Sequence, residues 1–232
     1  MKFRKLTIGD YFLIITNLVP VYGVWFEGWD AAQIFLVFCL ETVIIGLINV
    51  LKMACVTLFV KPGDGWDTTG RITKVGGLFF IIFFIFHYGI FVFVQTQIFF
   101  GVSGLIKDSS ILGSYMDIPR ALGHDGQLVL LIFIVYYSLD TLFNFFLSGE
   151  YKTISMGRLM IEPYGRIFIQ QFVVIVGSMF LSFGFHKIFI LILVLIKLYF
   201  ELFMNFSAFI KNAEAGNKKK MIEETAKNQP KS

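Results

Sequence analysis

The chain has 232 residues, of which 56% are hydrophobic and only 16% carry a charge. Soluble globular proteins carry about 25% charged residues, so this composition excludes an ordinary soluble fold. The net charge of +4 does not indicate nucleic-acid binding, because the basic residues stand at the ends of apolar segments and in the C-terminal tail. The length suits one membrane domain with little chain left for a soluble one.

Six apolar segments along the chain are long enough to cross a bilayer core of about 30 Å as helices. Helices and closed barrels are the only structures that span a bilayer, and these runs have helix length. The sequence therefore predicts an all-α bundle within residues 1–206, followed by a polar basic tail at 207–232. The predicted spans are 11–26, 31–52, 76–100, 127–147, 163–183 and 186–206.

Two features of the spans carry structural expectations. The run 76–100 contains no Asp, Glu, Lys or Arg, and we take it as the segment around which the rest of the bundle is organised. Pro163 begins the fifth predicted span, and a first helical position suits proline because its missing N–H has no partner there anyway.

The distribution of Lys and Arg predicts the orientation. With the N-terminus inside, the inner segments hold sixteen of these residues and the outer loops hold three. Since cytoplasmic segments are enriched in Lys and Arg, the sequence predicts that both termini are cytoplasmic.

Eight polar residues lie within or near the predicted spans and form the candidate polar core. A charge at the bilayer centre costs about 2.5–3.5 kcal/mol on insertion scales, so such side chains are expected to face the bundle interior and to find partners. We therefore predict that most of them converge on one site. They are Glu41, His87, Gln95, Asp140, Asn144, Gln171, Lys197 and Glu201.

Two functions from different classes remain open. The leading hypothesis is transport of a small solute, an ion or protons through a polar pocket at mid-depth, in which Glu41 and His87 titrate and Lys197 balances the acids. The alternative is a non-catalytic structural or assembly subunit of a membrane complex, because polar side chains in bundles often only join helices. In that case the Phe-rich lipid-facing surface and the basic tail would bind a partner.

A third hypothesis is an intramembrane hydrolase. The string Gly101-Val102-Ser103-Gly104 matches the GxSG of rhomboid proteases, but Ser103 lies at the end of a span, and the later histidines, His124 and His186, lie in a loop and at a span edge. We assign no catalytic residue. Glu41 and His87 are too few to hold a metal, so no metal and no cofactor is expected. The expected partners are the lipid bilayer and a membrane protein or a second copy, with no nucleic acid.

Several strings together resemble an uncharacterised bacterial family of multi-pass membrane proteins, a domain of unknown function. They are NLVPVYGVWFEGW at 17–29, LETVIIGLINVLKM at 40–53, FHYGIFVFVQ at 86–95, PYGRIFIQQ at 163–171 and LIKLYFEL at 195–202. The resemblance implies a helical bundle in a bacterial inner membrane and implies no activity.

The sequence departs from the pattern of that family at three places. The pattern has histidine where Gln95 and Gln171 stand, and another near Tyr137. Glutamine keeps the hydrogen bonding but binds transition metals poorly. The resemblance thus implies that this chain has lost a metal site or never used one.

Overall fold

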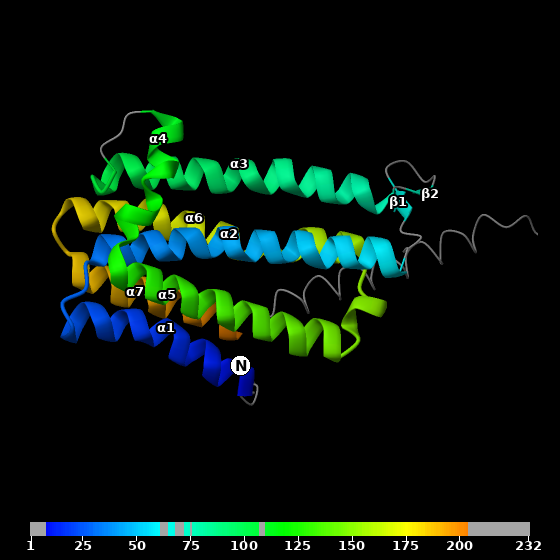
Figure 1. Ribbon diagram of the computed structural model, residues 1–232, viewed down its shortest axis with the longest axis horizontal. Coiled ribbons are helices and arrows are strands. Elements are labelled where there is room, and N and C mark those ends of the chain that lie inside the picture. Colours follow the sequence, from blue (N-terminus) through cyan, green and yellow to red (C-terminus); the bar gives the residue numbers. More distant parts are fainter. Residues whose placement is uncertain (1–7, 61–64, 68–71, 75, 107–109, 204–232) are drawn as a thin grey trace, which may run out of the picture.

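The computed structural model describes residues 8–60, 65–67, 72–74, 76–106 and 110–203. Six helices of 18 residues or more run nearly side by side in the described part (Figure 1). They are α1 (Ile8–Phe26), α2 (Ala31–Cys55), α3 (Gly77–Ser103), α5 (Ile118–Thr141), α6 (Met156–Ser182) and α7 (His186–Phe203).

Shorter elements connect or extend these helices. A π-helical turn, Val56–Val60, extends α2, and another, Leu142–Leu147, extends α5. The helix α4 (Ile111–Met116) precedes α5, and a 3-10 turn, Glu150–Lys152, leads towards α6. Between α2 and α3, β1 (Gly65–Asp67) and β2 (Ile72–Lys74) form an antiparallel pair with Trp66 opposite Thr73. The fold class is all-α apart from this small hairpin.

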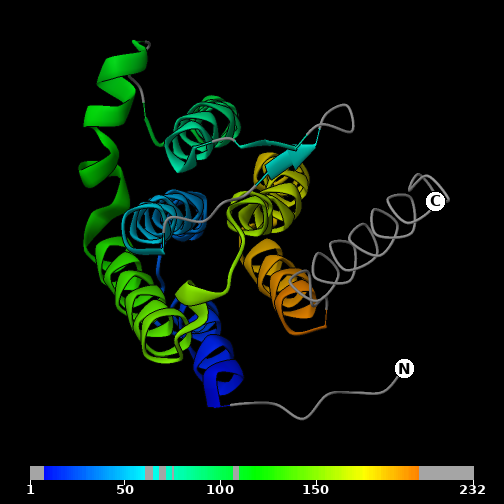
Figure 2. The same ribbon diagram turned by 90° about the vertical axis from the view of Figure 1, so that its right-hand side faces the viewer.

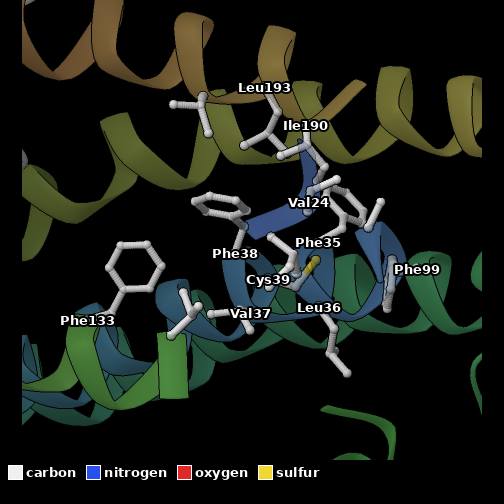
Figure 3. Packing of buried hydrophobic residues seen from close by; sticks show 14 of the residues in the cluster. Val24, Phe35, Leu36, Val37, Phe38, Cys39, Phe99, Phe133, Ile190 and Leu193 are labelled. Carbon is white, nitrogen blue, oxygen red and sulfur yellow. The ribbon is translucent and has the colours of Figure 1, made fainter. Parts of the chain in front are cut away.

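The central helix is α2, which packs against each of the other five long helices. Figure 2 shows it end-on with the other helices around it. Figure 3 shows why: Phe35, Phe38 and Cys39 of α2 lie among side chains from α3, α5 and α7. From the sequence we expected the bundle to be organised around residues 76–100, and that expectation is wrong, because the central helix is α2. The most apolar helix is α3, yet it lies at the edge, because a helix that is apolar all round needs no protein on its outer side.

Four described helical segments have the length and apolar composition needed to cross a membrane, namely Ile8–Phe26, Ala31–Val60, Gly77–Gly101 and Ile111–Leu147. Many large apolar side chains on them point outward, such as Phe12, Leu47 and Phe86. A soluble protein rarely exposes apolar surface on this scale. The chain is therefore a membrane protein with transmembrane-type helices.

The α1–α2 turn is held by side chains at one end of the bundle. Asp30 caps α2, accepting hydrogen bonds from the backbone N–H groups of Ala32 and Gln33 at 2.8 and 2.9 Å. A Cβ at Gly23 would lie 2.0 Å from the ring of Trp29, so the turn can fold back only onto a glycine. These contacts fix how α1 lies beside α2 and α7.

The start of α6 differs from the prediction. The helix begins at Met156, so Pro163 lies inside it rather than at its first position. A proline there leaves the carbonyl of Leu159 without its usual donor four residues on. The side chain of Asn49 from α2 donates to that carbonyl at 2.8 Å. An apolar environment tolerates an internal proline where a neighbouring helix satisfies the freed group, and Asn49 does so.

Candidate functional site

The site is a buried ion pair between α2 and α7. The ammonium Nζ of Lys197 lies 2.5 Å from both carboxylate oxygens of Glu41. Glu41 is 1% exposed and Lys197 is 6% exposed. An unpaired charge is costly in the apolar interior of a helical bundle, and here each group supplies the countercharge of the other.

Two neutral side chains complete the pair, one from α1 and one from α5. The Lys197 ammonium also donates to Oδ1 of Asn17 at 2.7 Å, and Asn17 has no exposed surface. The hydroxyl of Tyr137 donates to Oε1 of Glu41. Asn17 is itself oriented, because its Nδ2 donates to the carbonyl of Leu13 at 2.9 Å. Four helices thus meet at one polar cluster, which we call the Glu41–Lys197 cluster: Asn17, Glu41, Tyr137 and Lys197.

Aromatic rings form the walls of the cluster. The Lys197 ammonium lies 5.0 Å from the ring centroid of Phe38 and 4.8 Å from that of Phe133. Ring faces attract cations electrostatically, most strongly where water is excluded. Figure 3 shows both rings inside the bundle. They favour a cation at position 197 and would disfavour an anion there.

The helix geometry places the cluster well away from the end of the bundle at which α1 ends and α2 and α7 begin. Asn17 lies nine residues before the end of α1, Glu41 ten residues after the start of α2, and Lys197 eleven residues after the start of α7. At 1.5 Å per residue, these positions are about 13–17 Å from the same end of the bundle. Half the thickness of a hydrocarbon core is about 15 Å. Chemically, the arrangement is a neutralised and hydrogen-bonded pair that links α1, α2, α5 and α7.

His87 lies elsewhere, and the expectation that it shares one site with Glu41 is wrong. Its ring is exposed on the outer side of α3, where Nδ1 lies 2.7 Å from the hydroxyl of Tyr164 on α6. It stacks on Phe83 with centroids 5.2 Å apart and meets Phe91 edge-on at the same separation. The physical reason is the peripheral position of α3, which turns only one narrow side towards α2 and α6.

Asp140 and Asn144 also lie apart from the cluster. Asn144 donates to Asp140 Oδ1 at 2.7 Å, one turn away on the same helix, and Asn144 is exposed. These two residues satisfy each other locally instead of joining the interior. Glu201 stands one turn after Lys197 on α7, and its side chain lies outside the described part of the structure.

Gln95 and Gln171 are the remaining predicted residues. Gln95 is fully buried, and neither atom of its amide has a hydrogen-bond partner of good geometry among the described residues, although the Cys39 thiol adjoins it. The Oε1 of Gln171 is buried and lacks a partner in the same sense. The predicted convergence is therefore partial: the structure joins Glu41 and Lys197 and leaves the other described candidates outside their cluster.

The hydrolase motif has no base beside it in the described part of the chain. Ser103 is the last residue of α3, and its Oγ accepts a hydrogen bond from the backbone N–H of Leu105 at 3.3 Å. His124 is exposed and lies 3.6 Å from Asp125. Within the described residues no group of three or more His, Cys, Asp or Glu side chains is arranged to hold a metal ion.

A second charged cluster lies near the start of α6. Arg158 is mostly buried and pairs with Glu150 at 3.1 Å and with Glu162 at 3.8 Å. It ties the turn before α6 to the first turns of that helix. This cluster is at the same end of the bundle as the β1–β2 hairpin (Figure 1).

Sequence reasoning missed Asn17 and Tyr137 as members of the cluster. Asn17 was visible as a polar residue in the first span, and its depth, counted from the turn at the end of that span, matches that of Glu41. Tyr137 was visible as a tyrosine four residues after Phe133, on the same face of its helix as Val129. A hydroxyl that can donate to a buried carboxylate is the signal that could have identified it.

The fold and the site define a class: a helical membrane protein built around a buried ion pair. The chain belongs to the family described as "Family of unknown function (DUF6498)", whose model matches residues 2–222. The resemblance to a family of unknown function is thereby confirmed. Neither a curated protein nor a solved structure matches the chain.

Proposed function

We propose that the chain is a multi-pass protein of a bacterial inner membrane that acts as a non-catalytic structural or assembly subunit. The observation that supports this best is the Glu41–Lys197 cluster. Its two charged groups are buried, and they form hydrogen bonds with each other and with the neutral side chains of Asn17 and Tyr137. A transport site would need these groups to meet a solute or water, whereas a packing role needs them paired and covered.

In this proposal six helices cross the membrane. The four segments of transmembrane composition are joined by α6 and α7, which run beside them in Figure 1. Residues 1–206 form the transmembrane domain, and residues 207–232 form a cytoplasmic basic tail. Both termini are cytoplasmic because the segments rich in Lys and Arg then lie inside.

One observation favours transport as a second candidate. The buried amide of Gln95 lacks hydrogen-bond partners of good geometry among the described residues, and such a group is costly unless it meets water or a polar molecule.

The two functions are separated by comparing three full-length proteins in sealed proteoliposomes: the natural chain, Glu41→Gln/Lys197→Met and Gln95→Leu. A structural subunit predicts no proton flux above that of protein-free vesicles for any of them, measured with an enclosed pH dye. It also predicts that the natural chain migrates with other membrane proteins on native gels of solubilised membranes. Flux that the natural chain supports and either variant loses would refute the structural role.

A further inference from the structure

The feature that the proposed function does not explain is the polar pair formed by His87 and Tyr164 on the outer side of the bundle. His87 lies ten residues after the start of α3, about 15 Å along the helix and so near the middle of a bilayer core. Its Nδ1 contacts the Tyr164 hydroxyl, and its Nε2 has no partner among the described residues. An unpaired polar atom facing hydrocarbon costs free energy, and lipid tails offer nothing to pair with it.

We propose that α3 is the interface of a homodimer in which the His87 rings of two copies hydrogen-bond to each other. This deepens the proposed function, on which it rests, by naming the first partner of the subunit as a second copy. A neutral imidazole has one donor and one acceptor nitrogen, and a tyrosine hydroxyl can either donate or accept. In one copy Tyr164 donates to Nδ1 and leaves Nε2–H as a donor. In the other copy Nδ1–H donates to Tyr164 and leaves Nε2 as an acceptor.

The pair is therefore self-complementary, which is what contact across a two-fold axis requires. A two-fold axis along the membrane normal would bring the two His87 side chains to the same depth automatically. A partner protein of another kind would need its own hydrogen-bonding side chain at that depth, whereas a second copy always supplies it.

The apolar surface beside His87 has the spacing of a helix–helix seam. The exposed apolar surface of α3 is broad, and it contains one row of large side chains at intervals of four, three, four and three residues, each at least 40% exposed. This 3.5-residue average is the period at which two helices stay in contact along a left-handed crossing. The residues are Phe79, Phe83, Phe86, Ile90 and Phe93. Among the four segments of transmembrane composition, α3 is also the least buried within its own chain.

Cysteine cross-linking of the full-length chain in lipid vesicles tests the interface. The two native cysteines are first replaced, as Cys39→Ala and Cys55→Ala. A single cysteine is then introduced as Ile90→Cys, one turn from His87, or as Ile15→Cys on the outer side of α1 at similar depth. The dimer predicts efficient disulfide formation for Ile90→Cys and only collisional background for Ile15→Cys. Equal yields at the two positions would overturn the proposal.

A second measurement tests the hydrogen bond itself. Interhelical hydrogen bonds in membranes contribute about 0.6–1.7 kcal/mol, so His87→Phe should raise the dimer dissociation constant roughly three- to twentyfold. Tyr164→Phe, which keeps the ring but loses the hydroxyl, should weaken the dimer less. His87 is exposed and Tyr164 is partly buried, so circular dichroism checks that each variant folds.

An unchanged dissociation constant for His87→Phe, a monomeric natural chain, or association only with a different protein would each contradict the proposal. The two experiments read association alone. Their failure leaves the Glu41–Lys197 cluster and its structural role untouched. Flux that the natural chain supports and a cluster or Gln95 variant loses would refute that role without changing the association measurements.

Discussion

Replacing Lys197 by methionine tests the ion pair most informatively. The substitution removes the ammonium from both oxygens of Glu41. Among the described residues, the buried carboxylate then keeps only the Tyr137 hydroxyl as a hydrogen-bond partner. Breaking a buried pair by removing one member costs about 3–5 kcal/mol, and we expect a loss of that size in the free energy of unfolding. Glu41→Gln should cost less, near the lower end of that range at about 3 kcal/mol, because the ammonium keeps its contacts with Asn17 and the aromatic rings.

The double variant Glu41→Gln/Lys197→Met should be more stable than either single variant. No charge remains buried, the glutamine can still accept from Tyr137, and the main loss is the donor to Asn17, about 1 kcal/mol. The assay is unfolding by sodium dodecyl sulfate in mixed micelles, followed by circular dichroism. If the losses of the two single variants simply add in the double variant, the two groups do not stabilise each other and the reasoning is refuted.

The charge-swapped variant Glu41→Lys/Lys197→Glu is the matched control for geometry. It keeps both charges, but it places a carboxylate between the ring faces of Phe38 and Phe133, which attract cations. Partial rescue relative to Lys197→Met is expected, with stability still below that of the natural chain. Full recovery would show that the rings and neutral neighbours are irrelevant to the direction of the pair.

Three further substitutions have outcomes that the same unfolding assay can measure. Asn49→Leu should cost about 1–3 kcal/mol, because it leaves the buried carbonyl of Leu159 without a donor. The cost should be clearly smaller in a Pro163→Ala background, where the alanine N–H donates to that carbonyl. Equal costs in both backgrounds would contradict the role assigned to Asn49. Gly46→Leu should cost about 1–3 kcal/mol, because a Cβ there already meets a tyrosine ring at 2.6 Å, while Gly89→Leu, with open space around it, should be tolerated. Tyr137→Phe should cost about 1.5–3 kcal/mol through loss of a hydrogen bond to a charged group, and no loss would mean that the hydroxyl does not hold Glu41.

The helices were the predictable part of the fold. Segments such as 31–52 and 76–100 consist almost entirely of apolar residues over the length of a bilayer core, and the described helices cover them closely. The sequence could not show which helix is central. Hydropathy ranks α3 highest, but burial inside a bundle depends on which neighbours a helix has, and lipid satisfies an apolar surface as well as protein does.

Pro163 shows a second limit of sequence reasoning. Its position looks like the start of a helix, but it lies inside α6, where Asn49, more than a hundred residues away in the chain, donates to the carbonyl that the proline leaves free. No local pattern contains that information. The same applies to Asn17, which joins Lys197 across 180 positions.

The candidate site was predictable in its charges and not in its membership. An unpaired charge inside an apolar bundle costs free energy, so Glu41 and Lys197 were each expected to have a partner, and in the structure they pair with each other. Asp140 and Asn144 meet the same need for a partner through each other, one turn apart, whereas His87 meets it only at Nδ1, through the Tyr164 hydroxyl on α6. The free-energy cost of a buried polar group says that a partner exists, and it does not say which one.

The most direct measurement of the central claim is the access of water to Glu41 in the folded protein. Intact vesicles containing the full-length chain are treated with a water-soluble carbodiimide and an amine, and carboxyl modification is mapped by mass spectrometry. A closed, paired cluster predicts that Glu41 stays unmodified while Glu27, exposed at the start of the turn between α1 and α2, is modified readily. Modification of Glu41 at a rate close to that of Glu27 would contradict it.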